Sequence, residues 1–269
     1  DCQSILKAFF NVLAFKDAYD LGAVNSVNWA RILAQVVYYF SAYVQLGLPE
    51  RFQVAVPTGN FGNIFAGYIA RRMGLPIETL ILATNQNDIL HRFFTTGRYE
   101  RGEVSFSYSP AMDIQVASNF ERYLYFEFGQ VAEKVEEFMK DFSSTGLATT
   151  TFNTLNVDAA FTSGRVSDED TVAILARIFE ETEYLLDPHT AVGVEIGLVK
   201  RRPEVPLVCL ATAHPSKFDE VIRQVIPDVE VSHPTLELLK DLPERKTLLE
   251  GEVGVVKDFI STFNDQLAS

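Results

Sequence analysis

Residues 57–63 read Pro-Thr-Gly-Asn-Phe-Gly-Asn and lie between a predicted strand, 52–56, and a predicted helix that begins near Ile64. A turn that passes through two glycines into a helix leaves several backbone N–H groups pointing at one spot, which suits an anion and most often a phosphate. The glycines let the backbone approach the phosphate, and we expect a Cβ on Gly62 to crowd it and to conflict with a positive φ there. Strand–glycine–helix turns also form for packing reasons alone, so both interpretations stay open.

A second set of polar residues, Asn25-Ser26-x-Asn28-x-x-Arg31, precedes and enters an apolar helix predicted over 27–46. Asn and Ser side chains at a helix start converge with its N–H groups, and Arg31 lies about one turn further along. Such a set suits the oxygens of a phosphate. By spacing alone, an N-capped helix with a surface arginine is the simpler interpretation.

Further polar residues follow predicted strands. Thr212 comes after the strand 206–210, at the carboxyl end where parallel α/β sheets bind ligands; capping of the next helix is the less favoured alternative. His189 and His214 stand at helix starts, where a single histidine is more often structural than catalytic. Asn85, Asn87 and Asp88 either contact a ligand or close a turn, and for Lys217 we favour a surface position over a phosphate contact.

Strands that alternate with helices predict an α/β fold with a parallel sheet. Strand 52–56, helix 64–73 and strand 79–83 form a βαβ unit, for which a right-handed crossover is expected. The other predicted elements are a helix in 87–96 ended by Gly97, two helices in 113–145, helices 167–182, 189–200 and 216–225, the strand 206–210, and two helices in 235–268.

Composition narrows the class of protein. The 269 residues are 47% hydrophobic, enough for one large domain or one and a half. The net charge of −13 and the lack of a Lys/Arg run argue against nucleic acid as a partner. Cys2 and Cys209 form no metal or disulfide pattern, and the sequence has neither a stretch of transmembrane length nor a signal peptide. We therefore expect no metal, no membrane association and a reducing cytoplasm.

Five stretches resemble, in the family's order, threonine synthase, a pyridoxal-phosphate (PLP) enzyme of the tryptophan-synthase-β structural class. They are residues 25–31, 57–63, 83–88, 187–193 and 211–218. The resemblance covers nearly the whole chain and is weakest at 125–165 and after 230. It implies a parallel twisted sheet flanked by helices, the large domain of that fold.

The resemblance also implies roles for particular residues. The residues implied to bind the PLP cofactor are Gly59, Asn60, Phe61, Gly62, Asn63 and Thr212, the last with its hydroxyl on the pyridine nitrogen. The residues implied to bind O-phosphohomoserine, a small phosphorylated amino acid, are Asn25, Ser26, Asn28, Arg31 and His189. No proton-transfer role is assigned to His189.

The Schiff-base lysine of such enzymes is the missing part. Phe15-Lys16-Asp17 has the same residues as the family's Phe-Lys-Asp motif. The resemblance, however, places the Schiff-base lysine many more residues before the phosphate loop than Lys16. We therefore interpret Lys16 as a decoy and expect the true lysine upstream of Asp1, which leaves the catalytic residue unknown. The chain would then work with the N-terminal part of the same enzyme and be inactive alone.

Three segments are expected: 1–22 as the end of a preceding small domain or a linker, 23–232 as the PLP-binding large domain, and 233–269 as a C-terminal helical tail. The predicted function is conversion of O-phospho-L-homoserine and water to L-threonine and phosphate. The alternatives are a threonine-synthase-like phospholyase, an amino-acid dehydratase of the same fold and, from a different class, a non-catalytic binding or regulatory fragment.

Overall fold

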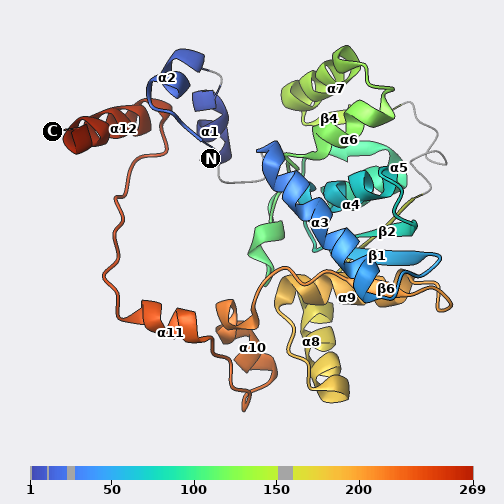
Figure 1. The fold of residues 1–269 in the computed structure, drawn as a ribbon. Coiled ribbons are helices and arrows are strands. Elements are labelled where there is room, and N and C mark those ends of the chain that lie inside the picture. The colour runs from blue at the N-terminus through green and yellow to red at the C-terminus, as the bar shows by residue number, and fades with distance from the viewer. Residues whose placement is uncertain (1, 11, 23–27, 151–159, 269) are drawn as a thin grey trace. The chain divides into compact units, whose positions relative to one another are not determined.

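The computed structural model describes residues 2–10, 12–22, 28–150 and 160–268 (Figure 1). The chain forms two compact units, one from Asn25 to Leu236 and one from the segments Asp1–Val24 and Glu237–Ser269. The division into segments 1–22, 23–232 and 233–269 stays a prediction. No helix within the described ranges is both long and apolar enough to span a membrane.

The larger unit is built on a four-stranded sheet in the order β5-β2-β1-β6. Its strands are β1 (Phe52–Pro57), β2 (Ile77–Thr84), β5 (Phe161–Arg165) and β6 (Leu207–Cys209). All the pairings in this sheet are parallel: β1 pairs with β2 and β6, and β2 pairs with β5. The predicted α/β class, with a parallel sheet flanked by helices, is confirmed.

Strand side chains alternate between two separate cores, one on each face of the sheet. Val54 and Val56 of β1 belong to the larger core, whereas Ala55 belongs to the smaller one with Val192 and Ile196 of α9 (Pro188–Lys200). Successive side chains of a strand point to opposite faces, so a strand covered on both sides reads as a continuous apolar run. This explains why 52–57 is fully buried and apolar except at Gln53, whose side chain accepts from the Arg202 N–H at 2.7 Å.

Helices cover both faces of the sheet (Figure 1). On the face of the larger core, α4 (Gly62–Arg72) connects β1 to β2 and packs against α3 (Trp29–Gln45). On the other face, α9 contacts the four strands of the sheet, and α8 (Asp168–Thr182) packs on α9. The further elements of this part are α5 (Ile89–Thr96), β3 (Arg98–Glu100), η1 (Pro110–Met112), α6 (Phe120–Glu127), α7 (Ala132–Thr145), β4 (Leu147–Thr149), η2 (Pro215–Lys217) and α10 (Asp219–Val225). Helix α11 (Pro234–Lys240) contains the boundary between the two units, which follows Leu236.

The smaller unit joins the two ends of the chain. It contains α1 (Cys2–Phe10), α2 (Leu13–Ala18) and α12 (Val253–Ala268). The Tyr19 hydroxyl donates to Ser261 Oγ at 2.9 Å, and the Lys257 ammonium lies 5.1 Å from the centroid of the Phe15 ring. The first and last segments therefore pack together rather than as independent pieces.

Most predicted elements are confirmed, with small shifts at their ends, but two expectations differ from the structure. The predicted helix 216–225 is interrupted at Phe218, where φ −134° and ψ 34° separate η2 from α10. Strand β5 and the antiparallel pair β3–β4 were not predicted. The β5 segment reads Phe-Thr-Ser-Gly-Arg, which lacks an apolar alternation, and its conformation comes from pairing with β2.

Candidate functional site

The loop that follows β1 leads directly into α4 at the carboxyl edge of the sheet. Thr58 fixes its start, because its backbone N–H donates to the Ala83 carbonyl at 2.8 Å and its hydroxyl donates to the Val56 carbonyl at 2.7 Å. The N-cap residue of α4 is Phe61, which supplies no side-chain hydrogen bond. The first N–H groups of α4 therefore have no capping side chain, and together with the helix dipole they can bind an anion.

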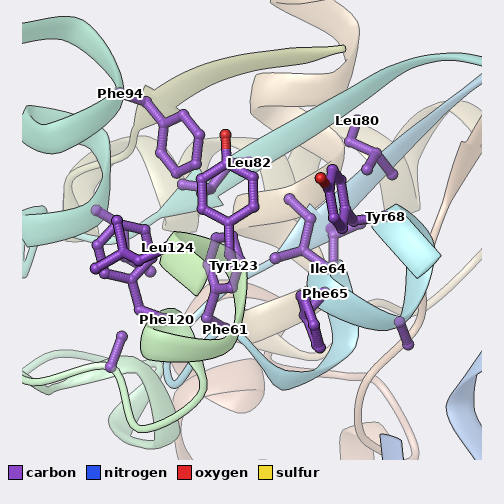
Figure 2. Packing of buried hydrophobic residues seen from close by; sticks show 14 of the residues in the cluster. Phe61, Ile64, Phe65, Tyr68, Leu80, Leu82, Phe94, Phe120, Tyr123 and Leu124 are labelled. Carbon is purple, nitrogen blue, oxygen red and sulfur yellow. The ribbon is translucent and has the colours of Figure 1, made fainter. Parts of the chain in front are cut away.

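Phe61 anchors this loop in the hydrophobic core. Its backbone is left-handed, with φ 66°, and its side chain is 1% exposed. Figure 2 shows Phe61 among buried aromatic residues, and its ring centroid lies 5.3 Å from that of Phe120 and 5.5 Å from that of Tyr123. Only the backbone of Phe61 can therefore reach a ligand. The expected positive φ at Gly62 is wrong, because the left-handed residue is Phe61 and core packing holds it there.

At Gly59 the loop has no room for a side chain, because another segment of the backbone lies against it. A Cβ at this position would lie 2.7 Å from the Ala111 carbonyl oxygen and 3.3 Å from the Met112 Cα. Both neighbours are backbone atoms of η1 and cannot rotate away. The close approach of η1 thus sets the shape of the loop, and no local sequence feature predicts it.

Two asparagines of the loop are held by other elements. The Asn60 carbonyl accepts from both the backbone N–H and the side-chain amide of buried Asn119, at 3.1 and 3.0 Å. The Asn63 carbonyl accepts from the Tyr39 hydroxyl of α3 at 2.8 Å. Burial raises the pKa of Tyr39, so this hydroxyl keeps its proton as a donor. Neither Asn119 nor Tyr39 carries a sequence signal that links it to the loop.

Thr212 lies at the same edge of the sheet as the loop. Strands β1 and β6 are parallel neighbours, so the residues after their carboxyl ends, including Gly59 and Thr212, emerge side by side. Thr212 is exposed, and its backbone N–H donates to Thr190 Oγ1 at 3.1 Å. The structure thus leaves the Thr212 hydroxyl at the surface while it holds the backbone in place.

Both ring nitrogens of His189 are bonded within the protein. Nδ1 lies 3.1 Å from Asp187 Oδ1, and Nε2 accepts from the Ala111 N–H at 3.2 Å. This pattern places the proton on Nδ1 of a neutral ring. The side chain is 5% exposed and packs against the Phe218 ring. The predicted substrate contact of His189 stays a prediction, and the observed contacts are structural.

The second predicted motif is described in part, because Asn25 and Ser26 lie outside the described residues. Asn28 is the N-cap of α3, and its side chain accepts from the Ala30 N–H at 3.0 Å. Arg31 is exposed in the first turn of the same helix. The Trp29 ring lies 6.1 Å from that of Phe65 in α4, so the first turn of α3 lies close to the N-terminal end of α4.

The polar residues after β2 close a turn. The Asn85 and Asn87 side-chain amides both donate to Asp113 Oδ1, at 2.7 and 3.0 Å, and thereby hold the residue that follows η1. Asp88 pairs with Arg92 and Arg165. The observed contacts follow the turn-closing alternative.

Two residues after β6 have surface positions. His214 caps η2 through its own ring, which accepts from the Ser216 N–H at 3.2 Å. Lys217 is exposed, in line with the favoured surface position.

Comparison with known proteins gives consistent matches. The family model described as "Threonine synthase, C-terminal" matches residues 190–260. A threonine synthase of Pseudomonas aeruginosa is 46% identical over 265 residues, covering 97% of this chain and 56% of that protein. A crystal structure of PLP-bound threonine synthase from Brucella melitensis has a TM-score of 0.87 at 44% identity, covering 97% of this chain and 57% of that one. The yeast threonine synthase structure has a TM-score of 0.85 at 38% identity, covering 98% and 58%.

The parallel sheet, its flanking helices and the loop at its carboxyl edge define the α/β fold of PLP-dependent enzymes of the tryptophan-synthase-β class. Within that class, the chain belongs to the threonine synthase family. It spans about half the length of the curated relatives that it matches.

Proposed function

We propose that the chain carries the cofactor and substrate sites of a threonine synthase, which uses PLP to convert O-phospho-L-homoserine and water to L-threonine and phosphate. The observation that supports this most is the uncapped N-terminus of α4 beside Thr212 at one edge of the sheet. That edge occurs in a chain that is similar to threonine synthases over nearly its whole length.

The loop residues fit the phosphate of PLP. The first turn of α4 offers N–H groups without a capping side chain, and the exposed Thr212 hydroxyl stands at the same edge for the pyridine nitrogen. When bound, PLP supplies an electron sink for bond breaking next to the substrate amino group. Thr212 would offer the ring nitrogen a neutral hydroxyl, which would make PLP a milder electron sink than a carboxylate partner would.

The substrate phosphate is assigned to Asn25, Ser26, Asn28 and Arg31. Arg31 lies in the first turn of α3, where the positive end of the helix dipole adds to its charge. A guanidinium can offer two parallel donors to a phosphate. The proposal therefore has two phosphate sites on packed helices, with the cofactor at α4 and the substrate at α3.

Replacing Arg31 by alanine is expected to lower kcat/KM for O-phosphohomoserine about 10- to 100-fold, since a hydrogen bond to a charged group contributes about 1.5–3 kcal/mol. PLP affinity should stay near that of the parent enzyme. Lysine should rescue only in part, because it lacks the planar fork. Arg223→Ala, at an exposed arginine of α10, is the matched control. Near-normal kcat/KM in Arg31→Ala would reduce the motif to a capped helix.

We further propose that the N-terminal part of the same enzyme supplies the Schiff-base lysine in the cytoplasm, so that this chain alone is inactive. Lys16 belongs to the smaller unit, with its ammonium 3.9 Å from Asp17 Oδ1. Mixing the chain with PLP, reducing with borohydride and mapping the peptides should give no stoichiometric label on Lys16. A full label at that residue would show that Lys16 is the anchor after all.

A further inference from the structure

One buried carboxylate connects the two segments to which we assign the ends of PLP. Asp187, the N-cap of α9, is 1% exposed. Its Oδ1 accepts from the His189 N–H at 2.9 Å and from the His189 ring, and its Oδ2 accepts from the Thr190 hydroxyl. These bonds exceed what a helix cap requires, because they also fix the orientation of two side chains.

The first connection leads to the phosphate loop. With its Nδ1 proton directed at Asp187, the His189 ring presents Nε2 as an acceptor, and that atom receives the Ala111 N–H. The carbonyl of the same Ala111 is the atom that a Cβ on Gly59 would meet. Asp187 thus determines, through His189, where η1 presses on the loop before α4.

The second connection leads to the residue assigned to the pyridine nitrogen. The Thr190 hydroxyl gives its proton to Asp187 Oδ2, which leaves its oxygen lone pairs to accept the Thr212 N–H at 3.1 Å. Thr212 follows a strand of only three residues and is itself exposed. The contact from Thr190 therefore restrains a backbone that the sheet alone holds weakly.

The charge on Asp187 suits this role. Burial by itself raises the pKa of this carboxyl, but the hydrogen bonds from His189 and Thr190 outweigh it and leave the pKa below its ordinary value. An ionised carboxylate only accepts hydrogen bonds, so both neighbours must direct their protons inward and their acceptor atoms outward.

We propose that Asp187 is a positioning residue that aligns the Ala111 peptide against the phosphate loop through His189 and the Thr212 peptide through Thr190. The proposal rests on the proposed function for its purpose, namely that one carboxylate sets the spacing between the two ends of the PLP site. Asp187 itself contacts neither end.

Three variants of the complete enzyme separate the two connections. Asp187→Asn keeps a good helix cap but cannot accept on both sides, Thr190→Val removes only the hydroxyl, and His189→Asn retains the atom position near Asp187 while it removes the acceptor for Ala111. Thr171→Val is the matched control, since Thr171 is a buried threonine in the first turns of α8 whose hydroxyl donates to Ser167 instead.

Amide hydrogen exchange without PLP is the first measurement. We expect Thr190→Val to accelerate exchange at least tenfold in the peptide around 212 only, and His189→Asn in the peptide around 111 only. Asp187→Asn should accelerate both, whereas Thr190→Ser should stay within about twofold of the parent. A residue that only caps the helix would not produce separate effects at 111 and 212. Equal acceleration in all peptides, or no acceleration at 111 and 212, would therefore overturn the proposal.

PLP titration by fluorescence is the second measurement. Asp187→Asn should raise the Kd for PLP at least tenfold, and the 31P resonance of bound PLP should shift in His189→Asn but not in Thr190→Val. If the parent enzyme bound no PLP, the proposed function would fail while the exchange pattern could still stand. If the parent bound PLP and the three variants bound it equally well, the positioning role alone would be wrong.

Discussion

Replacing Phe61 by alanine is expected to lower the free energy of unfolding of the complete enzyme by about 3–5 kcal/mol, as measured by denaturant titration. The ring is fully enclosed by other aromatic side chains, including Phe94, Phe120 and Phe161, so its removal leaves a cavity that rigid neighbours cannot fill. The motif that suggests a phosphate site thus contributes to the core as well.

The left-handed backbone of Phe61 gives this prediction a sharper form. Glycine adopts a positive φ without steric cost, so Phe61→Gly should be less destabilising than Phe61→Ala, the reverse of the usual order. Phe106, which is 90% exposed, offers the matched control, and Phe106→Ala should change stability by no more than about 0.5 kcal/mol. If the two phenylalanines gave equal losses, the anchoring role of Phe61 would be refuted.

Elements with strong local signals were predictable from the sequence. The segment 52–57, apolar except for Gln53, the capping box at Ser167 and the proline at the first position of α9 each encode their own element. Strand β5 could not be predicted, because its Ser163 and Gly164 carry little β-propensity. Glycine is favoured at position 164 by the packing of α9, because a Cβ there would lie 2.7 Å from an Ile196 side-chain atom of that helix.

The candidate site could be proposed from the sequence where the proposed function requires a particular residue type at a particular spacing. The loop from Gly59 to Asn63 and the position of Thr212 after a strand follow from local sequence. The residues that hold them do not, because Ala111, Asn119 and Thr190 make these contacts between distant segments of the chain. No periodicity or motif near these three residues specifies their partners.

The same lesson applies to the glycines of the loop. The sequence predicts the crowded, positive-φ position at Gly62, whereas the structure has the left-handed residue at Phe61 and a close backbone approach at Gly59. Which glycine is irreplaceable depends on η1, a short helix about fifty residues further along the chain. A glycine-rich motif therefore indicates that a loop makes a close approach, but the segment that packs against the loop determines which residue is at the closest point.

Replacing Gly59 by alanine is accordingly expected to weaken PLP binding about 10- to 100-fold in the complete enzyme. The new Cβ would lie 2.7 Å from a backbone oxygen of η1, and overpacking against atoms that cannot rotate costs about 1–3 kcal/mol. Either the loop or η1 must move, and both lie beside the start of α4. Because Gly59 has no positive φ, this loss reports the contact and not backbone strain.

Fluorescence titration of PLP into the variant would measure the effect, with Gly251→Ala as the control, since Gly251 has open space around it and an ordinary backbone. Gly62→Ala, which is expected to weaken PLP binding by steric conflict with the phosphate, is compared in both PLP affinity and unfolding midpoint. Gly59→Ala should lower that midpoint as well, because its conflict exists without PLP. A Gly59→Ala enzyme with parental PLP affinity and parental stability would show that η1 does not define this loop, and the position assigned to the cofactor phosphate would have to be abandoned.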